Sequence, residues 1–86
     1  MEDQDETDPA NVDRGILNYI LVKSSLFKEV AYHEGSGLLI VGTHKGATLE
    51  SYGVSRADYD AFMGAESKGV FHREVITPKY GYEKVN

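Results

Sequence analysis

The spacing of apolar residues changes once along this chain, near residue 53. Before that point, apolar runs are short and are separated by glycine-containing segments, at residues 33–37 and at Lys45-Gly46. Glycine permits the positive φ that tight turns need, so this part of the chain predicts antiparallel strands joined by short turns. After residue 53, apolar residues recur three or four positions apart, as on one face of a helix. The change of period predicts an α+β fold.

Three strands are predicted in a small antiparallel β-meander. They cover residues 27–32, the aliphatic run at residues 38–41, and residues 47–52. Val, Ile and aromatic residues favour strands, and the short turns between the runs favour antiparallel pairing. Residues 16–22 are also strongly apolar and provide a candidate fourth strand at the edge of the sheet.

Two short C-terminal helices are predicted to pack on this meander. Ser55 is the expected N-cap of the first, with Asp58 three residues later in a weak form of the capping box, and the helix should end near Gly64. Ser67 is the expected N-cap of the second helix, which Pro78 should close. The predicted core combines strand and helix residues: Phe27, Val30, Leu39, Val41, Tyr59, Phe62, Phe71 and Ile76.

All of the net charge of −5 lies at the N-terminal end of the 86 residues. Residues 1–14 contain six Asp and Glu residues against one Arg, whereas the rest of the chain has equal numbers of acidic and basic residues. A segment so charged and so poor in apolar surface is expected to be disordered. We therefore predict an acidic tail at residues 1–14 and one folded domain at residues 15–86, with the tail either aiding solubility or covering a basic patch as a nucleic-acid mimic.

Three further features bear on localisation. No apolar run approaches the roughly 20 residues that a membrane helix needs. The N-terminus is acidic, whereas a signal peptide begins with a basic region. The chain has no cysteine, which fits a reducing compartment. We expect a cytoplasmic protein that does not associate with membranes.

Residues 22–85 resemble the KTSC domain, a short module that occurs alone in bacterial and phage proteins and at the C-terminus of some lysyl-tRNA synthetases. The resemblance implies a small α+β domain, and the occurrence in a synthetase suggests RNA binding. It rests on these positions: Val22-Lys23-Ser24-Ser25, Val30-Ala31-Tyr32, Leu38 to Val41, Gly46, Gly53-Val54-Ser55, Tyr59, Ala65-x-Ser67-x-Gly69-x-Phe71, Ile76 and Tyr80.

The chain departs from the family pattern on the third predicted strand. The family usually has a Tyr-x-Tyr pair there, and an ungapped comparison places Leu49 and Ser51 at those positions. Tyr52 is adjacent, but successive residues of a strand point to opposite faces, so it does not replace Ser51. The resemblance therefore does not carry the role of that pair over to this chain.

The sequence shows no arrangement typical of catalysis or metal binding. The glycine-rich residues 35–37 are not followed by a helix that could bind phosphate, so they predict a hairpin turn. Ser55 and Ser67 are explained as helix caps. We expect surface or capping roles for the three isolated histidines, His33, His44 and His72. The protein is accordingly expected to have no enzymatic activity, no cofactor and no metal.

Basic and aromatic residues alternate from the second helix into residues 79–85, which are expected to be extended. Such a segment predicts a small binding module for RNA or single-stranded nucleic acid. The candidate contacts are Lys68, Arg73, Lys79, Tyr80, Tyr82 and Lys84. For these residues the alternative is that Tyr80 packs on the sheet while the lysines form a solvated rim.

A second functional hypothesis is a protein-interaction module. The chain could be a phage or bacterial accessory factor that inhibits a host protein. The apolar run at residues 16–22 could also pair with a second copy, because an exposed edge strand supports a weak homodimer. The sequence leaves the choice between a nucleic acid and a protein partner open.

Overall fold

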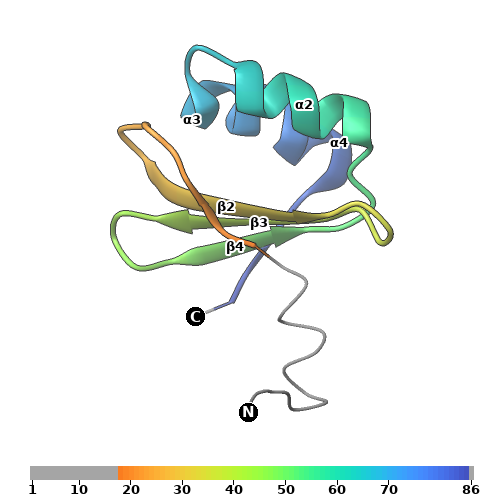
Figure 1. Cartoon of the computed structure of the whole chain (residues 1–86), viewed down its shortest axis with the longest axis horizontal. Coiled ribbons are helices and arrows are strands. Elements are labelled where there is room, and N and C mark those ends of the chain that lie inside the picture. Colours follow the sequence, from red (N-terminus) through yellow and green to blue (C-terminus); the bar gives the residue numbers. More distant parts are fainter. Residues whose placement is uncertain (1–17, 86) are drawn as a thin grey trace.

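The computed structural model describes residues 18–85, which form one sheet covered on one face by helices (Figure 1). The predicted acidic tail lies outside the described residues. The strands are β1 (Ile20–Leu21), β2 (Phe27–His33), β3 (Leu38–Thr43), β4 (Thr48–Ser51) and β5 (Glu83–Lys84). The helical elements are α2 (Arg56–Gly64), α3 (Lys68–Phe71), the π turn η1 (His72–Ile76) and α4 (Thr77–Tyr80).

The sheet has the order β1-β2-β3-β4-β5, and every neighbouring pair is antiparallel. The predicted α+β class and the meander of β2, β3 and β4 are confirmed. Five strands are present where three or four were predicted. The additional edge strand is β5, which forms because Gly81, with a φ of 72°, lets the chain turn back along β4. The backbone N–H of Val85 then donates to the carbonyl of Thr48 at 2.8 Å.

The register of the strands shows which residues lie on the helix-covered face of the sheet. Val30, Val41 and Leu49 lie opposite one another on successive strands, and the row ends at Lys84 on β5. Val30 and Val41 belong to the core, so this row faces the helices. Opposing residues point to the same side of a sheet, which places Lys84 on the helix-covered face beside Leu49.

The core joins β2, β3, α2 and the π turn. Six of the eight predicted core residues are buried, and Tyr59 and Phe71 are partly buried against them. Val54, before α2, is a further member that the sequence did not indicate. His72 is also inside, with 4 % of its surface exposed, so its predicted surface or capping role is wrong. It lies four residues before Ile76 on a helical segment and therefore faces the same core.

Both predicted helix caps are present. The Ser55 hydroxyl accepts from the N–H of Asp58 at 3.1 Å, and the Ser67 hydroxyl accepts from the N–H of Val70 at 3.2 Å. The prediction that Pro78 closes the second helix is wrong, because the helix continues through η1 into α4 and ends at Tyr80. Proline in a helix clashes with the carbonyl four residues before it. The wider π turn immediately before α4 relieves that clash.

The β2–β3 turn should be the position most sensitive to an added methyl group. Gly37 has a φ of 71°, and a Cβ there would lie 2.9 Å from the Gly53 Cα and the Val54 N. We expect Gly37→Ala to lower the unfolding free energy by about 3 kcal/mol or more, since backbone strain and a backbone clash add. Gly46→Ala is the matched control: it has a φ of 93°, but its Cβ meets no atom within 4 Å. Gly46→Ala should lower the unfolding free energy by only about 1–2 kcal/mol. Urea titration measures both variants. Equal losses would contradict the clash.

Candidate functional site

The structure separates the six predicted nucleic-acid contacts into three groups. Lys79 and Tyr80 bind the first turn of α2. Arg73 and Tyr82 line a cleft between the helices and the sheet. Lys68, at the start of α3, and Lys84, on β5, lie beside residues that line this cleft.

Lys79 and Tyr80 form a latch, which we define as their contacts with Ser55 and Asp58. The Tyr80 hydroxyl donates to Oδ2 of Asp58 at 2.5 Å and accepts from the N–H of Ser55 at 3.2 Å. Nζ of Lys79 donates to the same Asp58 oxygen at 2.7 Å. The hydrogen bond from Lys79 lowers the pKa of Asp58 most, and the hydrogen bond from Tyr80 adds to the effect. The latch fastens α4 to α2, and Tyr80 is partly buried against the core.

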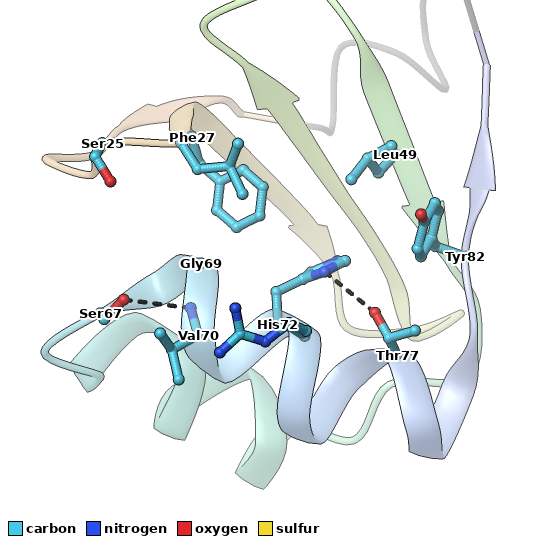
Figure 2. A pocket seen from close by; sticks show the side chains of 11 residues that line it. Ser25, Phe27, Leu49, Ser67, Gly69, Val70, His72, Thr77 and Tyr82 are labelled. Atoms are coloured by element: carbon cyan, nitrogen blue, oxygen red, sulfur yellow. Dashed lines mark hydrogen bonds between the residues drawn. The ribbon is translucent and has the colours of Figure 1, made fainter.

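The cleft has a volume of about 460 Å³ and opens between the start of β2, the α3–η1 helix and the segment after α4 (Figure 2). Phe27 and Leu49 contribute apolar surface from the sheet. Three apolar side chains that line it are strongly exposed for their type: Leu26 at 45 %, Val70 at 40 % and Tyr82 at 49 %. The rim of the cleft therefore offers apolar and aromatic surface to a ligand.

Arg73 brings a positive charge to the cleft. Its guanidinium is 3.3 Å from the Glu74 carboxylate, and both side chains are more than half exposed. Such surface pairs contribute little and exchange readily, so Arg73 remains available to an anionic ligand. Within residues 18–85, neither Lys68 nor Lys84 forms an ion pair.

His72 is the buried polar residue of the cleft. Its ring points from η1 toward the sheet and packs against Phe27, Phe62 and Tyr82, with centroid distances of 5.3, 6.2 and 5.7 Å (Figure 2). Nδ1 lies 3.4 Å from Oγ1 of Thr77, which the π turn brings close because its backbone bond joins residues 72 and 77. Burial lowers the pKa of His72, so the imidazole is neutral at pH 7.

Nε2 of His72 has no hydrogen-bond partner among the described residues. A buried nitrogen without a partner costs about 1–3 kcal/mol of folding free energy. The sequence contains a signal for the burial, because His72 precedes the apolar Ile76 by four residues, the spacing of one helix face. It contains no signal for the missing partner, which depends on packing across the sheet.

The other two histidines fasten turns. Nδ1 of His33 lies 2.7 Å from the Ser36 hydroxyl and also accepts from the Ser36 N–H, and Nε2 of His44 lies 2.8 Å from the Ser24 carbonyl. These contacts fit the capping role predicted for both. In the part of the chain that the structure describes, no group of three or more His, Cys, Asp or Glu residues could hold a metal. That part also has no helix long and apolar enough to cross a membrane.

Comparisons with known proteins agree with this architecture. Residues 23–80 match the model of the KTSC domain. The chain belongs to the KTSC domain family. A crystal structure of a KTSC domain protein from Yersinia pestis superposes with a TM-score of 0.73 and 28% sequence identity, covering 81% of this chain and 99% of that chain. No curated protein matches the chain.

The matched part of the KTSC domain includes His72 and Arg73 but not Tyr82 or Lys84. At the positions of the family's tyrosine pair, Leu49 lines the cleft and Ser51 is buried. The Ser51 hydroxyl donates to the Gly81 carbonyl at 2.7 Å. This bond fixes the turn that leads to Tyr82, so Ser51 positions one wall of the cleft.

The latch predicts a large difference between two tyrosine-to-phenylalanine variants. Tyr80→Phe removes a hydrogen bond to a carboxylate, and we expect it to lower the unfolding free energy by about 1–2 kcal/mol. Tyr82→Phe is the control, because the Tyr82 hydroxyl has no hydrogen-bond partner among residues 18–85. It should change stability by less than about 0.5 kcal/mol. Urea denaturation at pH 7 measures both, and equal effects would show that the latch contributes nothing.

His72 predicts an acid-dependent loss of stability. Its pKa is lowered in the folded state from the usual 6.5, so the unfolded chain binds the proton more tightly. The contribution of neutral His72 to the unfolding free energy is therefore fully present above pH 6.5. It is lost, at no more than about 1.4 kcal/mol per pH unit, as the pH falls toward the folded-state pKa. Urea titrations between pH 7 and pH 5 should show this loss in the native chain and not in His72→Phe. A loss of the same size in the variant would assign the effect to another group.

Proposed function

We propose that this KTSC domain is a non-enzymatic module that binds single-stranded nucleic acid, RNA in particular, in the cleft. The observation that carries the proposal is the convergence of Arg73, from the π turn, and Tyr82, from the segment after α4, on one cleft. A cation and an exposed aromatic ring that line the same cleft are the combination that single-strand binding uses, since phosphates meet the cation and bases stack on the ring. The suggested RNA binding of the family points the same way.

The dimensions of the cleft suit one base with its sugar-phosphate. Its volume of about 460 Å³ lies within the range of small-ligand sites. Half of the Tyr82 surface is exposed, so a base can stack on the ring without opening the core. Leu26 and Val70 supply apolar surface elsewhere in the cleft, and Val70 lies on the other side of His72 from Tyr82 (Figure 2). Each stacked base contributes about 1–3 kcal/mol in proteins that bind single strands.

The charge distribution sets a modest affinity. Residues 15–86 contain eight Lys and Arg and eight Asp and Glu, so no strong positive field surrounds the cleft. The candidate contacts include four cations, of which Lys79 is held in the latch. The other three, Lys68, Arg73 and Lys84, remain for phosphate contacts. In single-strand binding, each phosphate contact contributes about −0.7 to the slope of log affinity against log salt concentration. Three contacts therefore predict a slope of about −2.

A second candidate function is binding of a protein strand at β1. The described edge exposes three consecutive apolar residues, Tyr19 at 50 %, Ile20 at 47 % and Leu21 at 75 %. Strand addition at such an edge is a common mode of peptide recognition and of homodimer formation. This edge is separate from the residues that line the cleft, so variants can distinguish the two functions.

Fluorescence anisotropy with a labelled single-stranded RNA of 12 nucleotides tests the cleft. Tyr82→Ala should weaken binding about tenfold, within the range for loss of one stacked base, while Tyr82→Phe keeps the affinity. Arg73→Gln should reduce the size of the salt slope by about 0.7, and Lys79→Gln should leave it unchanged. Leu21→Ser, at the β1 edge, should not affect RNA affinity.

Three results would contradict the proposal. The native chain could show no salt-dependent binding of RNA. Tyr82→Ala and Arg73→Gln could bind as tightly as the native chain. Leu21→Ser could abolish RNA binding, which would favour the function at the β1 edge.

A further inference from the structure

A buried hydrogen-bonding group without a partner belongs to a residue that lines the proposed binding site. Nε2 of His72 has no partner among the described residues, and His72 lines the cleft while only 4 % of its surface is exposed. Buried polar groups in native proteins are almost always paired, and the exceptions call for an explanation. A ligand that presents a complementary group would satisfy Nε2, and this energy would appear as affinity.

Access to His72 is possible from one side. The three aromatic rings around it are Phe27, Phe62 and Tyr82, of which the first two have 0 % exposure. Tyr82 is half exposed, follows Gly81 on an irregular segment, and uses its hydroxyl in no hydrogen bond with another described residue. A ligand can therefore reach the imidazole by turning the Tyr82 ring aside, without opening the core.

The imidazole restricts the chemistry of the group that it can meet. It is neutral, and Thr77 faces Nδ1, so Nε2 offers either one N–H or one lone pair. The surrounding surface from Phe27 and Leu49 is apolar. The fitting group is flat and uncharged, with apolar faces and a hydrogen-bonding edge, whereas a phosphate would gain little from a neutral imidazole in this position.

We propose that the cleft takes one unpaired nucleobase, whose edge hydrogen-bonds Nε2 of His72 while Tyr82 stacks on its face. This inference rests on the proposed single-strand binding and adds base selectivity to it. Arg73, Lys68 and Lys84 contact the backbone and do not distinguish bases. His72 is then the residue that makes the affinity depend on the base.

The test compares the native full chain with His72→Phe on oligo-U, oligo-C and oligo-A of eight nucleotides. Phenylalanine keeps an aromatic ring in the core but has no Nε2. We expect the native chain to prefer one oligomer by about fivefold to tenfold, as for one additional hydrogen bond. The variant should bind the three within about twofold of one another, with the salt slope unchanged. Circular dichroism confirms that the variant is folded.

A second measurement does not depend on the variant. The ¹⁵N resonance of His72 Nε2 in the native chain should shift when the preferred oligomer saturates the cleft, and Nδ1 should shift less. Leu21→Ser serves as the control, because Leu21 does not line the cleft and the variant should retain both the shift and the preference.

The outcomes separate this inference from the proposed function. Binding of all three oligomers with equal affinity, the same preference in His72→Phe, or an unchanged Nε2 resonance would overturn the role of His72 and leave single-strand binding intact. If the native chain binds none of the oligomers, the proposed function fails and the inference fails with it.

Discussion

The π turn at residues 72–76 determines the position of everything that follows it in the chain. It lets one helical segment run across the sheet with Pro78 inside it. It also directs His72 and Ile76 into the core together. An α-helix of the same length would have to end before the proline. Tyr80 would then not reach Asp58, and β5 would not return along β4. The latch, the last strand and the cleft wall formed by Tyr82 all depend on this turn.

The latch explains why neighbouring residues with similar chemistry have different roles. Tyr80 and Tyr82 are two positions apart, but α4 ends between them and Gly81 reverses the chain direction. One ring is therefore fixed between α2 and α4 by hydrogen bonds, and the other lies on the cleft. Lys79 and Arg73 differ in the same way, because Asp58 is partly buried and holds its lysine, whereas Glu74 and its arginine are both exposed.

The sequence predicts the parts of this fold that are encoded locally. The meander follows from apolar runs between glycine turns, and the caps at Ser55 and Ser67 follow from single residues. The edge strand β5 was not predicted, because its two residues, Glu83 and Lys84, have no apolar pattern and pair only where Gly81 delivers them. Of the candidate contacts, Arg73 and Tyr82 line one cleft. The loss of Lys79 and Tyr80 to the latch depends on Asp58, 21 residues before Lys79, and composition cannot reveal such a contact.

A domain of this size has little stability to spare, which makes the unpaired nitrogen of His72 informative. A phenylalanine at this position would pack among the same rings without a desolvated nitrogen. Groups that lower stability in a cleft are typical of functional sites, where a ligand completes what folding leaves unsatisfied. The structural alternative is that His72 serves only to receive the Thr77 hydroxyl, but at 3.4 Å that bond is long and leaves Nε2 unexplained. His72 packs against Tyr82, the one exposed ring of the three around it. A ligand that displaces this ring can bond Nε2 and recover the free energy that the unpaired nitrogen costs.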